Sequence, residues 1–143
     1  MERCRKRYTH SMVYNSSDTE MLLFGGLDST TTSTVVYGDT WKMKNNVWTK
    51  IRDMGPGLLY GVDIVYTGKR AVLFGGSDGI AISHNTWDWR GTLWTQRQNM
   101  GPPGRGLHSM VYDNDRKIIV LFSGVDESRD FNDTWEHTIK EST

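Results

Sequence analysis

The sequence predicts an all-β fold, and its composition and internal repeats both support this prediction. The 143 residues include 15 threonines, 15 glycines, six tryptophans, six tyrosines and four phenylalanines, but only two alanines. Threonine and the aromatic residues favour strands, whereas a helical bundle would be rich in alanine, leucine and glutamate. A chain of this length is expected to form a single domain, here spanning residues 1–143.

Three repeats of about 48–50 residues run through the chain with the same motifs in the same order. The motif HSMVY occurs at 10–14 and 108–112, with a diverged copy, VDIVY, at 62–66. An apolar run ending in glycine follows each copy, at 21–26, 71–76 and 119–124. The tripeptide DTW or NTW comes next, at 39–41, 85–87 and 133–135. Such self-similarity is typical of repeat architectures.

Each repeat is interpreted as four short strands. The first strand is the HSMVY segment, the second is the apolar run, the third carries DTW, and the fourth carries a further tryptophan, at 47–51 and 93–97. Turn-forming residues separate these strands, at 15–19, 44–46, 67–70, 90–92 and 113–117. In the third repeat Ser142 stands where the others have Trp48 and Trp94, so a fourth strand is missing or unrecognisable there.

With these motifs in place, the chain resembles the kelch-repeat family from about Arg7 to about His137. The resemblance implies a β-propeller in which each repeat forms one blade of four antiparallel strands. The blades would span about 7–56, 57–102 and 103–143, the last with an incomplete outer strand. Because kelch-like propellers close with about six or seven blades, three blades would make half of a six-bladed ring.

The chain departs from the family pattern at several positions. Leu59 and Val62 replace the arginine and histidine of the other two repeats, and Ser123 replaces the first glycine of a pair. Trp89 also has no counterpart in the other repeats, which leaves a core position and an exposed contact both open. The glycine pairs themselves are interpreted as positive-φ positions where a neighbouring strand approaches closely. The third-strand tryptophans are expected to pack between sheets; they are Trp41, Trp87 and Trp135.

Two sets of side chains are candidates for a functional site. The resemblance implies that first strands line a central channel, which makes channel-lining candidates of Arg7, His10, Arg105 and His108. These four would either hydrogen-bond between blades or bind an anion or carboxylate. The long connections, at 27–38, 52–61, 77–84, 99–107 and 125–132, would emerge at one end of the blades and form the ligand face. The binding candidates there are Tyr37, Tyr60, His84, Arg105, Arg129 and Phe131, unless the loops only cover the blade ends.

Charge and cysteine content narrow the function classes. The formal net charge is +0, from 17 basic and 17 acidic residues, which gives no reason to expect a nucleic-acid or membrane partner. Cys4 is the single cysteine, so no internal disulfide or thiolate metal cluster is expected. No signal peptide is visible, and together with Cys4 this favours a cytoplasmic location. We assign no catalytic residue, metal ligand or cofactor.

The sequence therefore predicts a non-catalytic binding or scaffold module that takes a protein or a small ligand, such as a carbohydrate, on the long-loop face. We expect a homo-oligomer, with a C2 dimer favoured, because half a ring would expose the packing faces of its first and last blades. The alternatives are a carbohydrate-active or oxidative enzyme whose site forms only in the assembled propeller, and a propeller fragment with no evolved ligand.

Overall fold

The computed structural model describes residues 2–51, 55–97 and 101–139, and this part of the chain is all-β, with strands and loops but no helix. Its strands form two four-stranded sheets, one three-stranded sheet and one two-stranded hairpin, all antiparallel. The described residues accordingly include no helix that could span a membrane.

The first sheet has the strand order β1-β2-β5-β6. Its strands are β1 (Ser11–Asn15), β2 (Glu20–Phe24), β5 (Thr40–Lys44) and β6 (Val47–Ile51). The second sheet pairs β7 (Asp63–Tyr66), β8 (Ala71–Phe74), β9 (Thr86–Trp89) and β10 (Trp94–Arg97) in the same sequential way. The third sheet consists of β11 (Ser109–Asp113), β12 (Ile118–Phe122) and β13 (Thr134–Thr138). Each predicted strand within the described residues is therefore present within about a residue of its expected position, and Ser142 lies outside those residues.

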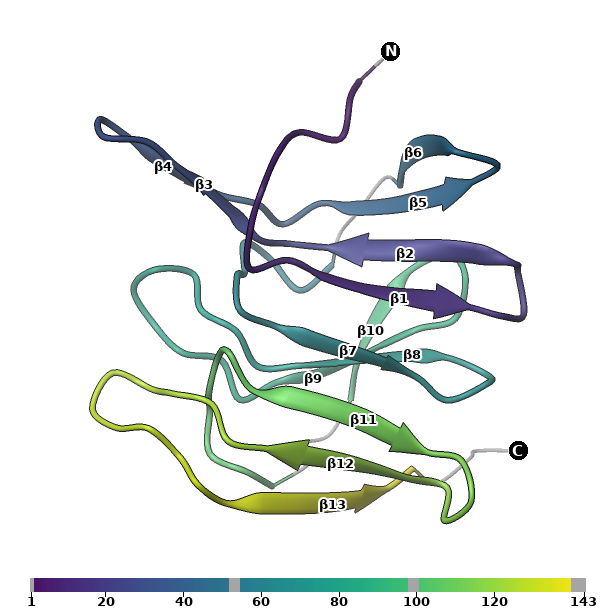
Figure 1. Ribbon diagram of the computed structural model, residues 1–143, viewed down its shortest axis with the longest axis vertical. Coiled ribbons are helices and arrows are strands. Elements are labelled where there is room, and N and C mark those ends of the chain that lie inside the picture. The colour runs from purple at the N-terminus through teal and green to yellow at the C-terminus, as the bar shows by residue number, and fades with distance from the viewer. Residues whose placement is uncertain (1, 52–54, 98–100, 140–143) are drawn as a thin grey trace.

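One element was not expected from the sequence. The predicted loop at 27–38 contains a hairpin of β3 (Leu27–Ser29) and β4 (Thr34–Val36). The tip is held by hydrogen bonds around Thr30, whose backbone N–H donates to Ser33 O at 2.8 Å. The β-branched run at Thr34–Val36 pairs with Leu27–Ser29, and the hairpin projects from the long-loop side in Figure 1, as does the loop between β12 and β13.

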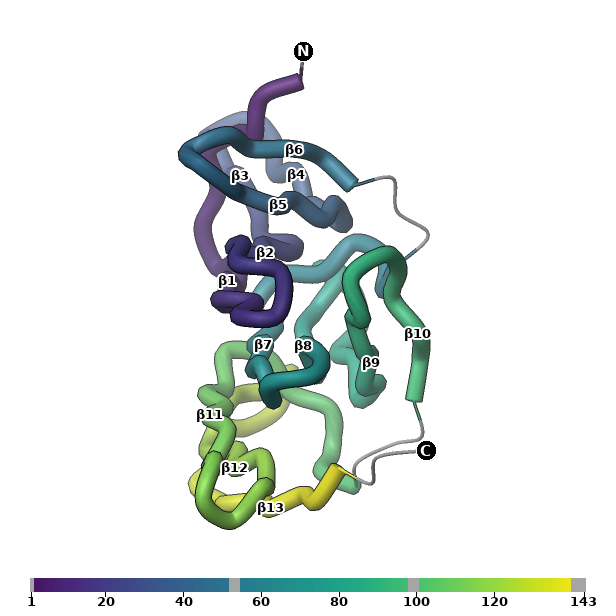
Figure 2. The backbone as a smooth tube through the Cα atoms, turned by 90° about the vertical axis from the view of Figure 1, so that its right-hand side faces the viewer, coloured from purple at the N-terminus to yellow at the C-terminus, as the bar shows by residue number. Residues whose placement is uncertain are grey.

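The three larger sheets fan out from their first strands. Figures 1 and 2 show β1, β7 and β11 side by side, with the remaining strands of each sheet extending away from them in different directions. The first and second sheets enclose one apolar cluster, which contains Phe24, Leu73, Trp89 and Trp94. The second and third sheets enclose another, which contains Phe74, Met110 and Leu121. Trp89 is only 2% exposed, so it is a core residue.

Two backbone hydrogen bonds join each pair of successive sheets at their inner ends. Between the first and second sheets, the Gly26 N–H donates to Leu59 O at 2.9 Å and the Gly61 N–H donates to Thr9 O at 2.8 Å. Between the second and third sheets, the Gly76 N–H donates to Arg105 O at 2.9 Å and the Leu107 N–H donates to Gly61 O at 2.8 Å. The matched bonds occupy equivalent positions in the repeats, so the two junctions are built in the same way.

Candidate functional site

The two ends of the sheets differ in the length of their connections. Figure 1 shows the long connections on one side of the molecule and the tight turns on the other. The long-loop end comprises residues 27–38, 55–61, 77–84, 101–107 and 125–132. The rest of the predicted connections, residues 52–54 and 99–100, lies outside the described residues. Because loops held by a rigid sheet can vary without disturbing the core, this end is the natural place for a binding site.

Arg7 and Arg105 each organise one loop of this end. Arg105 donates two hydrogen bonds to the Asp133 carboxylate, at 2.6 and 3.0 Å, and a third to Ser123 O at 2.8 Å. Its guanidinium carbon also lies 3.9 Å from the centroid of the Phe131 ring. Such a bidentate, stacked geometry is specific to arginine and fixes the loop between β12 and β13.

The first repeat contains the same cluster. Arg7 donates to the Asp39 carboxylate at 2.5 and 3.0 Å and to Gly25 O at 3.1 Å, and it lies 4.0 Å from the Tyr37 ring centroid. In both repeats the tryptophan two residues after the aspartate also donates its indole N–H to the carboxylate. Two of the predicted channel residues therefore bind aspartates of their own repeat.

These hydrogen bonds set the ionisation of the two carboxylates. Burial raises the pKa of Asp39, but the hydrogen bonds from Arg7 and Trp41 outweigh it and hold the pKa below its usual range. For Asp133 the hydrogen bonds from Arg105 are the largest influence, and its pKa is also lowered. Both clusters are therefore charged pairs at neutral pH. Asp39 and Asp133 were not among the predicted site residues. The sequence does contain a signal for them: the two repeats with the arginine also have the aspartate, and the second repeat, with Leu59, has Asn85 instead.

The second repeat replaces all three members of the cluster. Leu59 stands in place of the arginine, Asn85 in place of the aspartate and Ser83 in place of the aromatic residue. A groove of about 400 Å³ lies at this position and is lined by all three. Its other lining residues are Pro56, Gly57, Leu58, Asp78, Ala81, Ile82 and the predicted candidate His84. The second repeat therefore has a groove at the position where the other two repeats have the arginine–aspartate cluster.

A second groove of about 250 Å³ lies beside the first and shares Ile82 with it. It separates the loops of the second and third repeats, and the predicted candidate Tyr60 lines it. Ile80, at 90% exposure, and Leu107, at 59%, also line this groove, while the similarly exposed Leu58 lines the first one. Large apolar side chains exposed around neighbouring grooves are typical of contact surfaces.

A third groove, of about 610 Å³, lies between the N-terminal segment and the loop before β5. Arg3, Arg5, Lys50, Tyr37 and Trp41 are among its lining residues. Lys50 also forms an ion pair with Glu2 at 3.5 Å. The groove therefore combines cationic and aromatic groups at the edge of the long-loop end.

The remaining predicted residues lie apart from one another. His10 is exposed, whereas His108 is buried against Phe74, with ring centroids 5.5 Å apart. Burial, followed by the charge of Arg105, lowers the pKa of His108 to about 4, so this side chain is neutral at pH 7. Arg129 is exposed at the edge of its loop and lies 4.5 Å from the Phe131 centroid.

A larger hollow, of about 660 Å³, lies at the opposite, short-turn end. Lys42, Lys44 and Arg90 give it a cationic wall. Lys42 already contacts Glu20 at 2.8 Å and donates to Gly91 O at 2.9 Å, and Lys44 donates to Asp18 O at 3.1 Å. Because both lysines already have partners within the chain, size alone does not make this hollow the better site.

Among residues 2–51, 55–97 and 101–139, no three His, Cys, Asp or Glu side chains are grouped as ligands for a metal ion. The chain matches no protein-family model, and no curated protein matches it. The candidate site therefore rests on its own geometry, which is two neighbouring grooves rimmed by exposed apolar side chains at the long-loop end.

Proposed function

We propose that this chain is a non-catalytic binding module of the kelch-like β-propeller type, in which each of the three larger sheets is a blade. Two observations support the blade assignment: the sequential strand order of each sheet and the repetition of the same two hydrogen bonds at both junctions. The kelch-like motifs fall at matched places in these sheets, with DTW or NTW at the start of β5, β9 and β13.

The proposed ligand is a protein segment that docks across the two grooves of the long-loop end. The observation that carries this proposal is the exposure of Leu58, Ile80 and Leu107 around those grooves. Exposed apolar anchors beside a hollow are suited to the side chains of a peptide or protein. Asp78, Asp126 and Glu127 also line the grooves, which favours a segment carrying basic residues.

The test is selection of a random peptide library on the wild-type chain. Peptides that bind should lose at least tenfold in affinity with the Ile80→Ser, Leu107→Ser double variant. The matched control is Val47→Ser, Leu93→Ser, which removes two exposed apolar side chains beside the short turns, at the start of β6 and just before β10, and should leave binding unchanged. Peptides that depend on Val47 and Leu93 instead would contradict the proposed face, and binding of glycans alone would favour a carbohydrate ligand.

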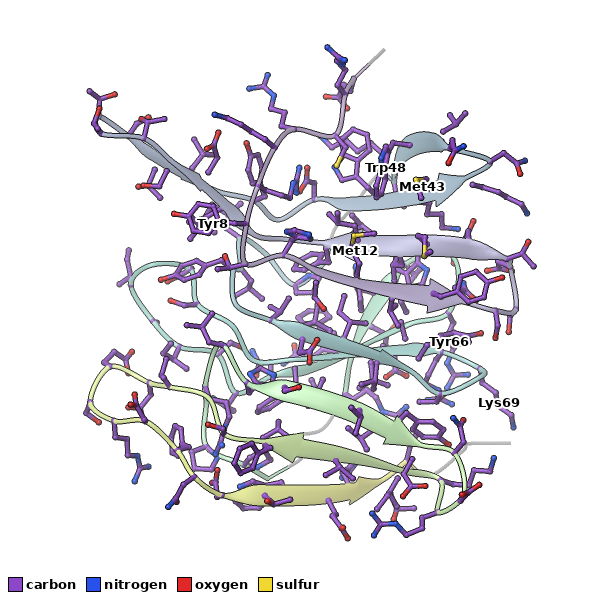
Figure 3. The ribbon with its side chains drawn as sticks, in the orientation of Figure 1. Tyr8, Met12, Met43, Trp48, Tyr66 and Lys69 are labelled. Carbon is purple, nitrogen blue, oxygen red and sulfur yellow. The ribbon has the colours of Figure 1, made fainter. Side chains whose placement is uncertain are left out.

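We further propose that a second copy of the chain packs head to tail on the first. Two sheet faces have no neighbouring sheet among the described residues: the outer face of the first sheet, part of which the N-terminal segment covers beside Trp41 and Lys50, and the outer face of the third. The former carries Met12, Tyr14, Met21, Leu23, Trp41, Met43 and Trp48, three of which are labelled in Figure 3. Strand alternation puts these residues at the same positions as the second-sheet residues that pack on the first sheet.

The outer face of the third sheet complements this surface by position. Val111, Val120 and Phe122 occupy the places of Val13, Leu22 and Phe24, which pack against the second sheet. Val111 and Phe122 are more than half exposed. Two such contacts would close a symmetric pair of chains. Light scattering should then find a species of twice the 16.4 kDa chain mass, and a monomer at all attainable concentrations would contradict this part of the proposal.

A further inference from the structure

The first residue of each glycine pair lies against the next sheet. Gly25 and Gly75 both have positive φ, and the residue that follows each donates the hydrogen bond that joins two sheets. A Cβ added to Gly25 would overlap Leu59 O, and one added to Gly75 would overlap Arg105 O, far inside the distance at which real side chains approach a carbonyl. Glycine at this position is therefore a condition for packing another sheet in the same way.

Ser123 occupies this position in the third sheet. Its φ is 65°, close to the 69° of Gly25, and its N–H donates to Asp133 O at 3.1 Å just as the Gly25 N–H donates to Asp39 O at 3.2 Å. The backbone conformation at Ser123 is thus the same as at Gly25 and Gly75, but Ser123 has a Cβ atom, which the two glycines lack. The Ser123 Oγ donates to Phe131 O at 2.8 Å, which ties the side chain to its own loop.

We infer that Ser123 weakens the head-to-tail contact between two copies of this chain, an inference that rests on the homodimer proposed above. In a contact built like the internal junctions, the Gly124 N–H would donate to Arg7 O of the second copy. The Ser123 Cβ would then overlap that same oxygen. The second copy must therefore shift away, lose this hydrogen bond, or both. The contact between copies is then weaker than the junctions within one chain, and the two copies can dissociate.

The rest of the contact is compatible with a second copy. The Trp94 indole N–H donates to Thr40 Oγ1 at 2.9 Å across the first junction, and the matched pair between copies is Trp48 and Thr134. Lys42 reaches Gly91 O in the next sheet, whereas the matched residue on the open face, Glu136, pairs with Arg116 of its own sheet at 2.9 Å. Ser123 is thus the point of steric conflict in an otherwise matched surface.

The experiment compares the association of three purified chains by sedimentation equilibrium: wild type, Ser123→Gly and Ser123→Ala. We expect Ser123→Gly to raise the association constant at least tenfold, because it removes the Cβ. Its fold should be retained, since φ is positive at this position and glycine adopts that conformation without strain. Ser123→Ala is the matched control: it lacks Oγ but keeps Cβ, so it should associate like the wild type.

A second variant locates the contact. Met12→Asp, on the opposite open face, should abolish the association gained by Ser123→Gly, because Met12 matches Ile64 and Met110 of the internal junctions. Equal association of all three chains as dimers would overturn the role of Ser123 and leave the homodimer standing. Monomers throughout would overturn both, and a gain with Ser123→Ala equal to that with Ser123→Gly would show that Oγ, not Cβ, opposes contact.

Discussion

The third repeat and the second repeat solve the same structural problem with different chemistry. In the third, the loop before the DTW strand is held by the Arg105–Asp133 pair with Phe131 stacked beneath it. In the second, Leu59 and Asn85 occupy the paired positions and a groove lies beside them. The difference teaches that the charged pair is one way of fixing the loop, and that its absence opens surface at the end where a ligand is proposed to bind.

A similar exchange occurs inside the sheets. Glu20 and Lys42 pair across β2 and β5 at 2.8 Å, whereas Arg70, just before β8, pairs with Asp88 of β9 at 2.9 Å. The signs are reversed at matched positions, and Ile118 occupies the third-repeat position without any charge. The first two repeats therefore keep an ion pair at these positions with its signs reversed, whereas in the third Glu136 pairs with Arg116 of the neighbouring turn instead.

The largest effect is expected from converting the third repeat toward the second. Arg105→Leu removes a guanidinium that is 0% exposed from a carboxylate that is 35% exposed, and it should lower the free energy of unfolding by about 3 kcal/mol. Adding Asp133→Asn should restore at least about 1 kcal/mol, since the uncompensated carboxylate is then gone. Chemical denaturation measures both.

The matched control is Arg129→Leu. Arg129 contacts the same Phe131 ring but is 60% exposed, so its loss should cost less than about 1 kcal/mol. Equal losses for Arg105→Leu and Arg129→Leu would mean that the ring contact, not the buried ion pair, holds the loop.

The next effect concerns the histidine position, which holds His10, Val62 and His108 in the three repeats. The pKa of His108 falls from 6.5 to about 4 on folding, so between these pH values His108 is protonated in the unfolded chain and neutral in the folded chain. The contribution of neutral His108 to the free energy of unfolding is therefore fully present above about pH 6.5. It is lost as the pH falls toward 4, by up to about 3 kcal/mol. His108→Val should remove most of this decline.

His10→Val provides the control for that experiment, because His10 is exposed at the equivalent place. Burial and the charge of Arg7 also lower the pKa of His10, but its side chain is exposed, so urea unfolding at pH 7 and at pH 4.5 should show a smaller loss of pH dependence for His10→Val than for His108→Val. If His108→Val kept the full pH dependence, other groups would have to account for it, beginning with His10 and His137, whose pKa values are also lowered.

The smallest effect compares an internal junction with an open face. Thr40→Val removes the acceptor of the Trp94 indole hydrogen bond and should cost about 1 kcal/mol in thermal or chemical unfolding. Thr134→Val alters the equivalent but exposed residue and should change monomer stability by less than about 0.5 kcal/mol. A comparable loss at Thr134 would mean that this face is already covered under the conditions of the measurement.

Much of the fold could be predicted because each repeat supports the interpretation of the others. The first strands, apolar runs and DTW strands recur in order, so a weak copy such as 62–66 could be aligned with two clear ones. The hairpin at 27–36 could not be found this way, because its three-residue strands are reduced to the single bridges Ser77–Ile82 and Val125–Asp130 in the other repeats. The longer strands pair a local run of threonines and valines that the matched loops of the other repeats lack.

Sequence by itself determined the number and order of the repeats, the strand positions and the places where glycine is required, because these follow from local periodicity and backbone conformation. Only the tertiary structure decided what the motif residues contact. In the folded chain Arg7 and Arg105 bind aspartates 32 and 28 residues away. Trp89 and His108 are buried, and Ile80 and Leu107 line the same groove. The physical reason is that these contacts join segments far apart in the chain, and their geometry exists only once the sheets have packed.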